Sequence, residues 1–127
     1  LSFERQSYYK FGSGFGLDRD VMKWFGEHYV RSNEDYTNPL VSPLLANVSN
    51  APRTLIIAAQ YDVLRDEAFL YEQKLKKHGV DVQLHEAKGL VHSYFTNNDL
   101  FEKEITETIS LIRHFLQTKK VHNNIGA

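Results

Sequence analysis

The feature that most constrains the fold is an uninterrupted apolar and β-branched run from Thr54 to Ala59, which is followed closely by Asp62. A run without polar alternation is typical of a parallel strand that is covered on both faces. Open parallel sheets place their functional groups in the crevice at the carboxyl ends of the strands. The sequence therefore predicts a buried strand over residues 54–59, with Asp62 as the first side chain that can reach such a crevice.

A helix and a second strand are predicted to follow this run. Asp66 is the expected start of the helix, because its side chain can accept hydrogen bonds from the free backbone N–H groups of the first turn. The apolar stripe of the helix comprises Leu64, Ala68, Tyr71 and Leu75. Gly79 is expected to close the helix in the left-handed conformation, and alternation over residues 81–87 indicates a second, less buried strand. Because strand–helix–strand crossovers are right-handed, the two strands should be parallel neighbours.

Residues 88–92 are predicted to form a short loop that brings His92 to the same sheet edge as Asp62. An aspartate beside a histidine can hold the imidazole tautomer and stabilise the imidazolium, while the imidazole acts as general base and then as general acid. Asp62 and His92 are therefore the candidate catalytic residues, although a turn-capping Asp and a solvated His are the alternatives. A nucleophile is missing, because Ser13, in Gly12-Ser13-Gly14, follows no apolar strand and does not match a nucleophile elbow.

Composition argues against several functional classes. The net charge of −1 is spread without long runs of one sign, so neither a nucleic-acid partner nor an anionic membrane surface is expected. The chain has no cysteine, which removes disulfides and thiolate metal sites, and its six histidines are not spaced like metal ligands. No apolar segment approaches the roughly 18 residues of a transmembrane helix, and no targeting segment is visible, so a cytoplasmic location is favoured. No metal or organic cofactor is expected.

The remaining segments are assigned from their periodicity. Residues 1–16 and 31–53 show no helical or strand period and are predicted to be irregular. Asp18 is expected to cap a helix that ends near Val30. Its apolar stripe, which should be buried, comprises Val21, Trp24, Phe25 and His28. A final helix from residue 98 or 99 to residue 117 is expected to cover one face of the sheet, followed by a polar tail from Thr118 that should fray.

Two strands are too few for the domain that the sequence indicates. A two-stranded parallel sheet removes too little apolar area from water to offset the entropy of ordering the chain. The chain is therefore expected to be part of a larger α/β domain, and its start at Leu1 rather than Met agrees with this. We expect residues 1–53 to contribute to a cap and residues 54–127 to form the strand–helix–strand–helix part of the core.

Four motifs together resemble a known family. They are Ser42-Pro43-Leu44, the run from Tyr61 to Glu67, Gly79-Val80, and Gly89-Leu90-Val91-His92. These segments are similar to the C-terminal portion of the hormone-sensitive-lipase-like carboxylesterases of the α/β-hydrolase superfamily. The resemblance implies that Asp62 is the acid and His92 the histidine of a Ser-Asp-His triad, and it implies that the serine and the oxyanion segment lie upstream. Ser93 departs from the family pattern, which usually has Gly after the histidine.

The resemblance implies a carboxylic ester hydrolase that acts on small-molecule esters through an acyl-enzyme, without a cofactor. The missing N-terminal half of the same fold would be its structural partner, homo-oligomerisation is left open, and this chain by itself should be inactive. One alternative is a non-catalytic small-molecule-binding protein or receptor on the same scaffold, which retention of both Asp62 and His92 disfavours. The other alternative is a serine peptidase of the same superfamily, against which the Leu-Arg-Asp-Glu continuation after Val63 argues.

Overall fold

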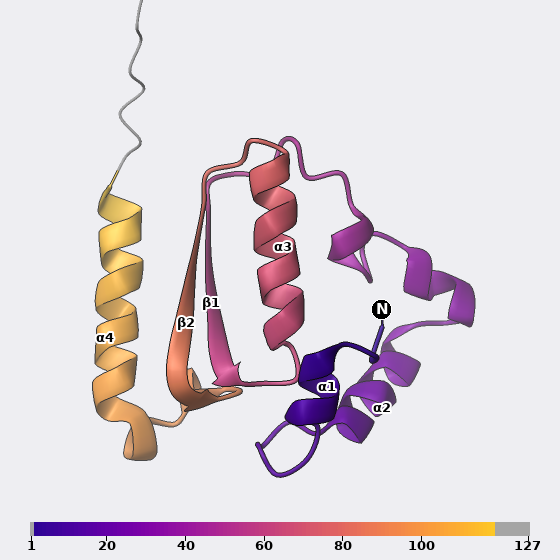
Figure 1. The fold of residues 1–127 in the computed structure, drawn as a ribbon, viewed down its shortest axis with the longest axis horizontal. Coiled ribbons are helices and arrows are strands. Elements are labelled where there is room, and N and C mark those ends of the chain that lie inside the picture. The colour runs from indigo at the N-terminus through magenta and orange to yellow at the C-terminus, as the bar shows by residue number, and fades with distance from the viewer. Residues whose placement is uncertain (1, 119–127) are drawn as a thin grey trace, which may run out of the picture. The chain divides into compact units, whose positions relative to one another are not determined.

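The computed structural model describes residues 2–118, which fall into two compact units that divide after Ser93. Figure 1 shows the order of the elements. In the first unit these are α1 (Gln6–Lys10), α2 (Arg19–Tyr29), the short 3₁₀ helices η1 (Asn33–Thr37) and η2 (Pro43–Leu45), β1 (Thr54–Tyr61), α3 (Arg65–Lys77) and β2 (Val82–Val91). The second unit contains η3 (Tyr94–Thr96) and α4 (Asn98–Gln117).

Strands β1 and β2 form a two-stranded parallel sheet, and α3 connects them. Thr54 lies opposite Val82, and the pairing continues in register to Ala59 opposite Ala87. The predicted α/β class with two parallel strands is thus confirmed. The predicted loop over residues 88–92 is wrong for most of its length, because β2 continues to Val91 through an irregularity in the pairing.

The end of α3 follows the prediction and its start does not. Gly79 adopts φ 75°, its N–H donates to Lys76 O, and the Val80 N–H donates to Leu75 O. This pair of hydrogen bonds is the Schellman motif, in which glycine takes the left-handed position. The helix begins at Arg65, so Asp66 lies inside its first turn and is not its N-cap. The prediction for Asp66 is corrected, because its carboxylate is engaged by a distant segment, as described below.

The core beside the sheet is built from residues of three different segments. Val48, Leu75 and Val82 are buried together, and Leu75 is fully buried. The partly buried side chains around them are Ala46, Ala51, Ile56, Tyr71 and Val80. Residues 31–53, predicted to be irregular, contain only the two 3₁₀ turns, and they are anchored on α3 and β2 through Val48.

The N-terminal segment differs from the prediction in two respects. Residues 1–16 were expected to be irregular, yet α1 forms there, since Tyr8 is buried and fixes this short helix. Helix α2 matches its predicted bounds, but its apolar stripe is exposed: Trp24 is 53% and Phe25 49% exposed. The buried position on α2 is Gly26, which lies close to the Phe3 ring. The absence of a side chain allows this contact, so α2 packs through its glycine face and not through its stripe.

The second unit consists of the predicted C-terminal helix and the turn before it. Helix α4 has the expected bounds, with one non-helical residue at Phe101. The buried hydroxyls of Tyr94 and Thr108 share a 2.7 Å hydrogen bond that ties η3 to α4. The covering of the sheet by this helix stays a prediction, and the predicted tail beyond Thr118, with His122, lies outside the described residues. Within residues 2–118, no helix is long and apolar enough to span a membrane.

Candidate active site

Asp62 follows β1 directly and lies in the tight turn that leads into α3. Its backbone carbonyl accepts a 3.1 Å hydrogen bond from the Arg65 N–H, and its Oδ1 accepts one of 2.9 Å from the Leu64 N–H. The residue is 8% exposed. Because the turn supplies a donor to one carboxylate oxygen, the second oxygen is held in a defined direction.

A bulge in β2 determines where the following histidine lies. The strand register changes by two residues between Ala59 and Tyr61, so that Tyr61 lies opposite Val91. Gly89, within the bulge, adopts φ 77°, and its N–H donates a 2.8 Å hydrogen bond to Gln60 Oε1. The histidine after Val91 therefore stands at the same level as the aspartate after Tyr61. Sequence reasoning missed this bulge, although a glycine in a strand is a signal for one.

The structure brings Asp62 and His92 together, and the Nδ1 of His92 lies 2.8 Å from Asp62 Oδ2. The His92 side chain is 35% exposed and that of Asp62 only 9%. A carboxylate is solely an acceptor, so Nδ1 carries the proton and the neutral imidazole presents Nε2 as its accepting nitrogen. This is the geometry of an oriented general base. The catalytic role of the two residues is not tested by the geometry and stays a prediction.

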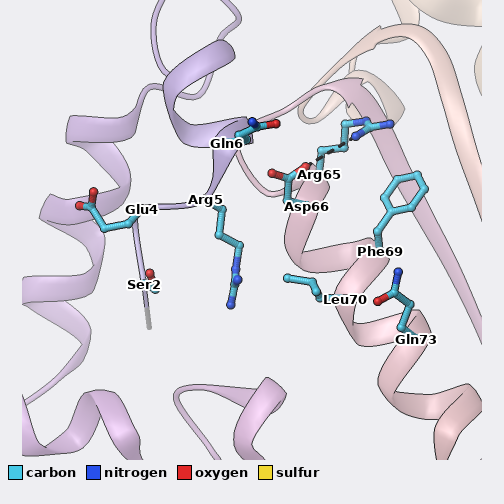
Figure 2. A pocket seen from close by; sticks show the side chains of 9 residues that line it. All are labelled: Ser2, Glu4, Arg5, Gln6, Arg65, Asp66, Phe69, Leu70 and Gln73. Carbon is cyan, nitrogen blue, oxygen red and sulfur yellow. Dashed lines mark ion pairs between the residues drawn. The ribbon is translucent and has the colours of Figure 1, made fainter.

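Arg65 and Asp66 flank the same turn at the start of α3. The Arg65 Nη2 lies 2.7 Å from Glu86 Oε1 on β2, and its guanidinium stacks 4.5 Å from the Phe69 ring centroid. These contacts link the start of α3 to β2. Arg65 and Asp66 also line a cavity of about 510 Å³, together with Arg5 and neighbouring N-terminal residues. Figure 2 shows Arg5 on the N-terminal segment across from Asp66. Neither Asp62 nor His92 lines this cavity, so it is separate from the candidate site.

Ser13, His28 and His85 lie outside this site. Ser13 is exposed in the loop after α1, and His28 packs on the Trp24 ring with its Nδ1 2.8 Å from the Trp24 carbonyl. His85 lies in β2, which agrees with its predicted place on a strand. Among the described residues, no group of three or more potential metal ligands comes together.

Comparison with known proteins defines the class. A family model described as the alpha/beta hydrolase fold matches residues 1–96 of the chain. The chain therefore belongs to the α/β-hydrolase fold family, and the resemblance to its hormone-sensitive-lipase-like members is confirmed.

Two curated relatives illustrate the similarity. The chain is 32% identical over 117 residues to an ethyl acetate hydrolase of Pseudomonas putida, covering 91% of this chain and 36% of the relative. It is 33% identical over 96 residues to an arylesterase of Saccharolobus solfataricus, covering 74% of this chain and 31% of the relative. The chain thus spans about a third of the length of these relatives.

Solved structures give the same class. An esterase of Pyrobaculum calidifontis superposes with a TM-score of 0.81 at 34% identity, over 87% of this chain and 36% of that structure. A thermostable esterase of Pseudomonas putida ECU1011 superposes with a TM-score of 0.79 at 32% identity, over 91% of this chain and 36% of that structure. The described residues accordingly form a part of the α/β-hydrolase fold.

Proposed function

We propose that the complete protein is a carboxylic ester hydrolase in which Asp62 and His92 are the acid and the base of a Ser-Asp-His triad. The observation that carries the proposal is the 2.8 Å contact between His92 Nδ1 and Asp62 Oδ2 at the carboxyl ends of two parallel strands. That location is where sheets of this kind hold their functional groups. The names of the relatives, an ethyl acetate hydrolase and an arylesterase among them, support ester chemistry.

In the proposed reaction, Nε2 of His92 takes the proton of a serine hydroxyl as the serine oxygen attacks the ester carbonyl carbon. The resulting tetrahedral intermediate collapses when the imidazolium gives this proton to the leaving alcohol oxygen, and an acyl-enzyme remains. Water then attacks the acyl carbonyl, with His92 again as base, and releases the acid and the free serine. Asp62 stabilises the imidazolium in both halves and does not itself take the proton.

The serine and the oxyanion donors are proposed to lie in residues that this chain does not include. In α/β-hydrolases the order along the sequence is serine, acid and histidine, which agrees with Asp62 preceding His92. Oxyanion donors supply much of the transition-state stabilisation, so residues 1–127 alone should not turn over esters. We assign residues 1–53 to the cap and residues 54–127 to the core, with short to medium acyl esters as substrates and no cofactor.

The test is hydrolysis of p-nitrophenyl acetate by the complete protein. Asp62→Asn and His92→Ala should each lower kcat by about a thousandfold or more, on the scale of triad deletions. Asp20→Asn on α2 and His85→Ala on β2 are matched controls at exposed positions, and both should retain turnover. Near-normal turnover by the Asp62 and His92 variants, with folding intact, would remove these residues from the mechanism and favour a binding role on the same scaffold.

A further inference from the structure

Helix α3 begins next to the Asp62 turn without a cap from its own sequence. Its N-cap residue is Leu64, whose side chain has no oxygen or nitrogen, and no side-chain capping hydrogen bond is formed there. The first N–H groups of a helix have no partner within the helix, and a short polar side chain normally satisfies one of them. The Asp62 carbonyl satisfies the Arg65 N–H, so the Asp66 N–H still needs an acceptor from elsewhere in the fold, and the Asp66 carboxylate needs a donor.

Ser7 of α1 supplies both groups. Its N–H donates a 2.9 Å hydrogen bond to Asp66 Oδ2, and its Oγ lies 3.5 Å from the Asp66 N–H, which donates to it. This reciprocal arrangement is that of a capping box, here formed between segments 59 residues apart. The Ser7 hydroxyl also donates a 2.5 Å hydrogen bond to the carbonyl of Val63. Ser7 is 1% exposed, so water does not compete for these bonds.

The three contacts of Ser7 enclose the backbone that orients the candidate acid. Val63 directly follows Asp62 in the sequence, and Asp66 lies four positions after Asp62. Between them lies the Leu64 N–H that holds Asp62 Oδ1. We infer that Ser7 is a positioning residue for the triad acid: it locks the turn over residues 62–66 so that Asp62 Oδ2 faces His92. This inference rests on the proposed function.

The neighbouring residue, Tyr8, contacts α3 at a different point from Ser7. Tyr8 is 1% exposed, and its hydroxyl donates to Glu67 Oε2 at 3.4 Å. Arg5 Nε lies 3.7 Å from Glu67 Oε1. Figure 2 shows Gln6 of α1 above the first turn of α3, next to Arg65 and Asp66. Tyr8→Phe removes this hydrogen bond to Glu67 and leaves the Ser7 contacts to the turn over residues 62–66 in place, so it is the matched control.

The experiment compares Ser7→Ala and Tyr8→Phe in the complete protein, with p-nitrophenyl acetate as substrate. Ser7→Ala should lower kcat by about ten- to a hundredfold, because small displacements of catalytic groups have effects of this size. KM should stay within about twofold, since the ground-state pocket is not altered. Tyr8→Phe should leave kcat near the wild-type value. The low-field proton signal of the His92 Nδ1–H, a mark of its bond to a carboxylate, should weaken or shift in Ser7→Ala only.

Several results would overturn the inference. Wild-type kcat in Ser7→Ala would do so, and so would an equal loss in Tyr8→Phe, which would indicate general loosening of α1. If Ser7→Ala does not fold, Asp66→Ala, which removes the acceptor of the Ser7 N–H, should show the same loss of kcat, and its absence would decide against positioning. If Asp62→Asn is inactive and Ser7→Ala has wild-type kcat, the proposed function stands and only this inference fails. If Asp62→Asn has normal turnover, the proposed function itself fails.

Discussion

The Gly89 N–H donates a 2.8 Å hydrogen bond to Gln60 Oε1 across the bulge between β1 and β2. This bond spans the point at which the strand register changes by two residues. Without the change, Tyr61 would pair with Gly89, and His92 would lie beyond the level of Asp62. The contact between Asp62 and His92 therefore depends on a local irregularity of the backbone, and not only on the parallel pairing of the strands.

Gly89→Ala should distinguish the effect of the bulge on activity from its effect on the stability of the protein. Gly89 has φ 77°, which an L-residue adopts at a cost of about 1–2 kcal/mol, although a Cβ there would meet nothing within 4 Å. Gly79→Ala is a matched control, since Gly79 has φ 75° and an equally open position at the end of α3. Urea unfolding should show similar losses for both variants, while kcat should fall only for Gly89→Ala. Equal kcat values would contradict a role of the bulge in placing His92.

Leu75→Ala should identify the core that supports the site. Leu75 is fully buried in a cluster with Val48 and Val82, so truncation leaves a cavity, and the free energy of unfolding should fall by about 2–5 kcal/mol. Leu40 is 85% exposed, and Leu40→Ala should change the free energy of unfolding by less than about 0.5 kcal/mol. Chemical denaturation of the complete protein measures both. A small loss for Leu75→Ala would mean that this cluster is not part of the stabilising core.

Glu67 should make stability depend on pH. Burial raises the pKa of the Glu67 carboxyl above its ordinary value of 4.5, against the opposing effects of Arg5 and of the Tyr8 hydrogen bond. The folded state then holds this proton more tightly than the unfolded chain, so the free energy of unfolding falls as the pH rises from 4.5 through the raised pKa. Glu67→Gln removes this contribution and should gain stability relative to wild type across that interval.

Urea unfolding of both proteins in steps from about pH 4 to pH 7 gives the comparison. As the pH rises, the unfolding free energy of Glu67→Gln should increase relative to that of wild type. The difference should level off above the raised pKa of Glu67. A difference that is constant with pH, or that moves in favour of wild type, would show that the folded state does not hold the Glu67 proton more tightly.

Local patterns in the sequence were sufficient for much of the fold. The apolar run over residues 54–59 became β1, Gly79 closed α3 as predicted, and the amphipathic pattern at the C-terminus became α4. The position of Asp62 directly after β1 also followed from the run itself. Each of these features depends on periodicity or on the conformational freedom of one residue, and both are properties of the chain alone.

Tertiary structure decided the features that join distant segments. Packing determines the burial of Gly26 in place of the Trp24 stripe and the capping of α3 by Ser7. It also determines the two-residue register shift that places His92 at the same level as Asp62. Ser7 and Asp66 are 59 residues apart, and no local pattern indicates that a serine in a short helix will satisfy the start of another. The sequence by itself thus determined that Asp62 and His92 follow the ends of neighbouring strands. Tertiary contacts determined their mutual geometry, because only packed backbones fix a register.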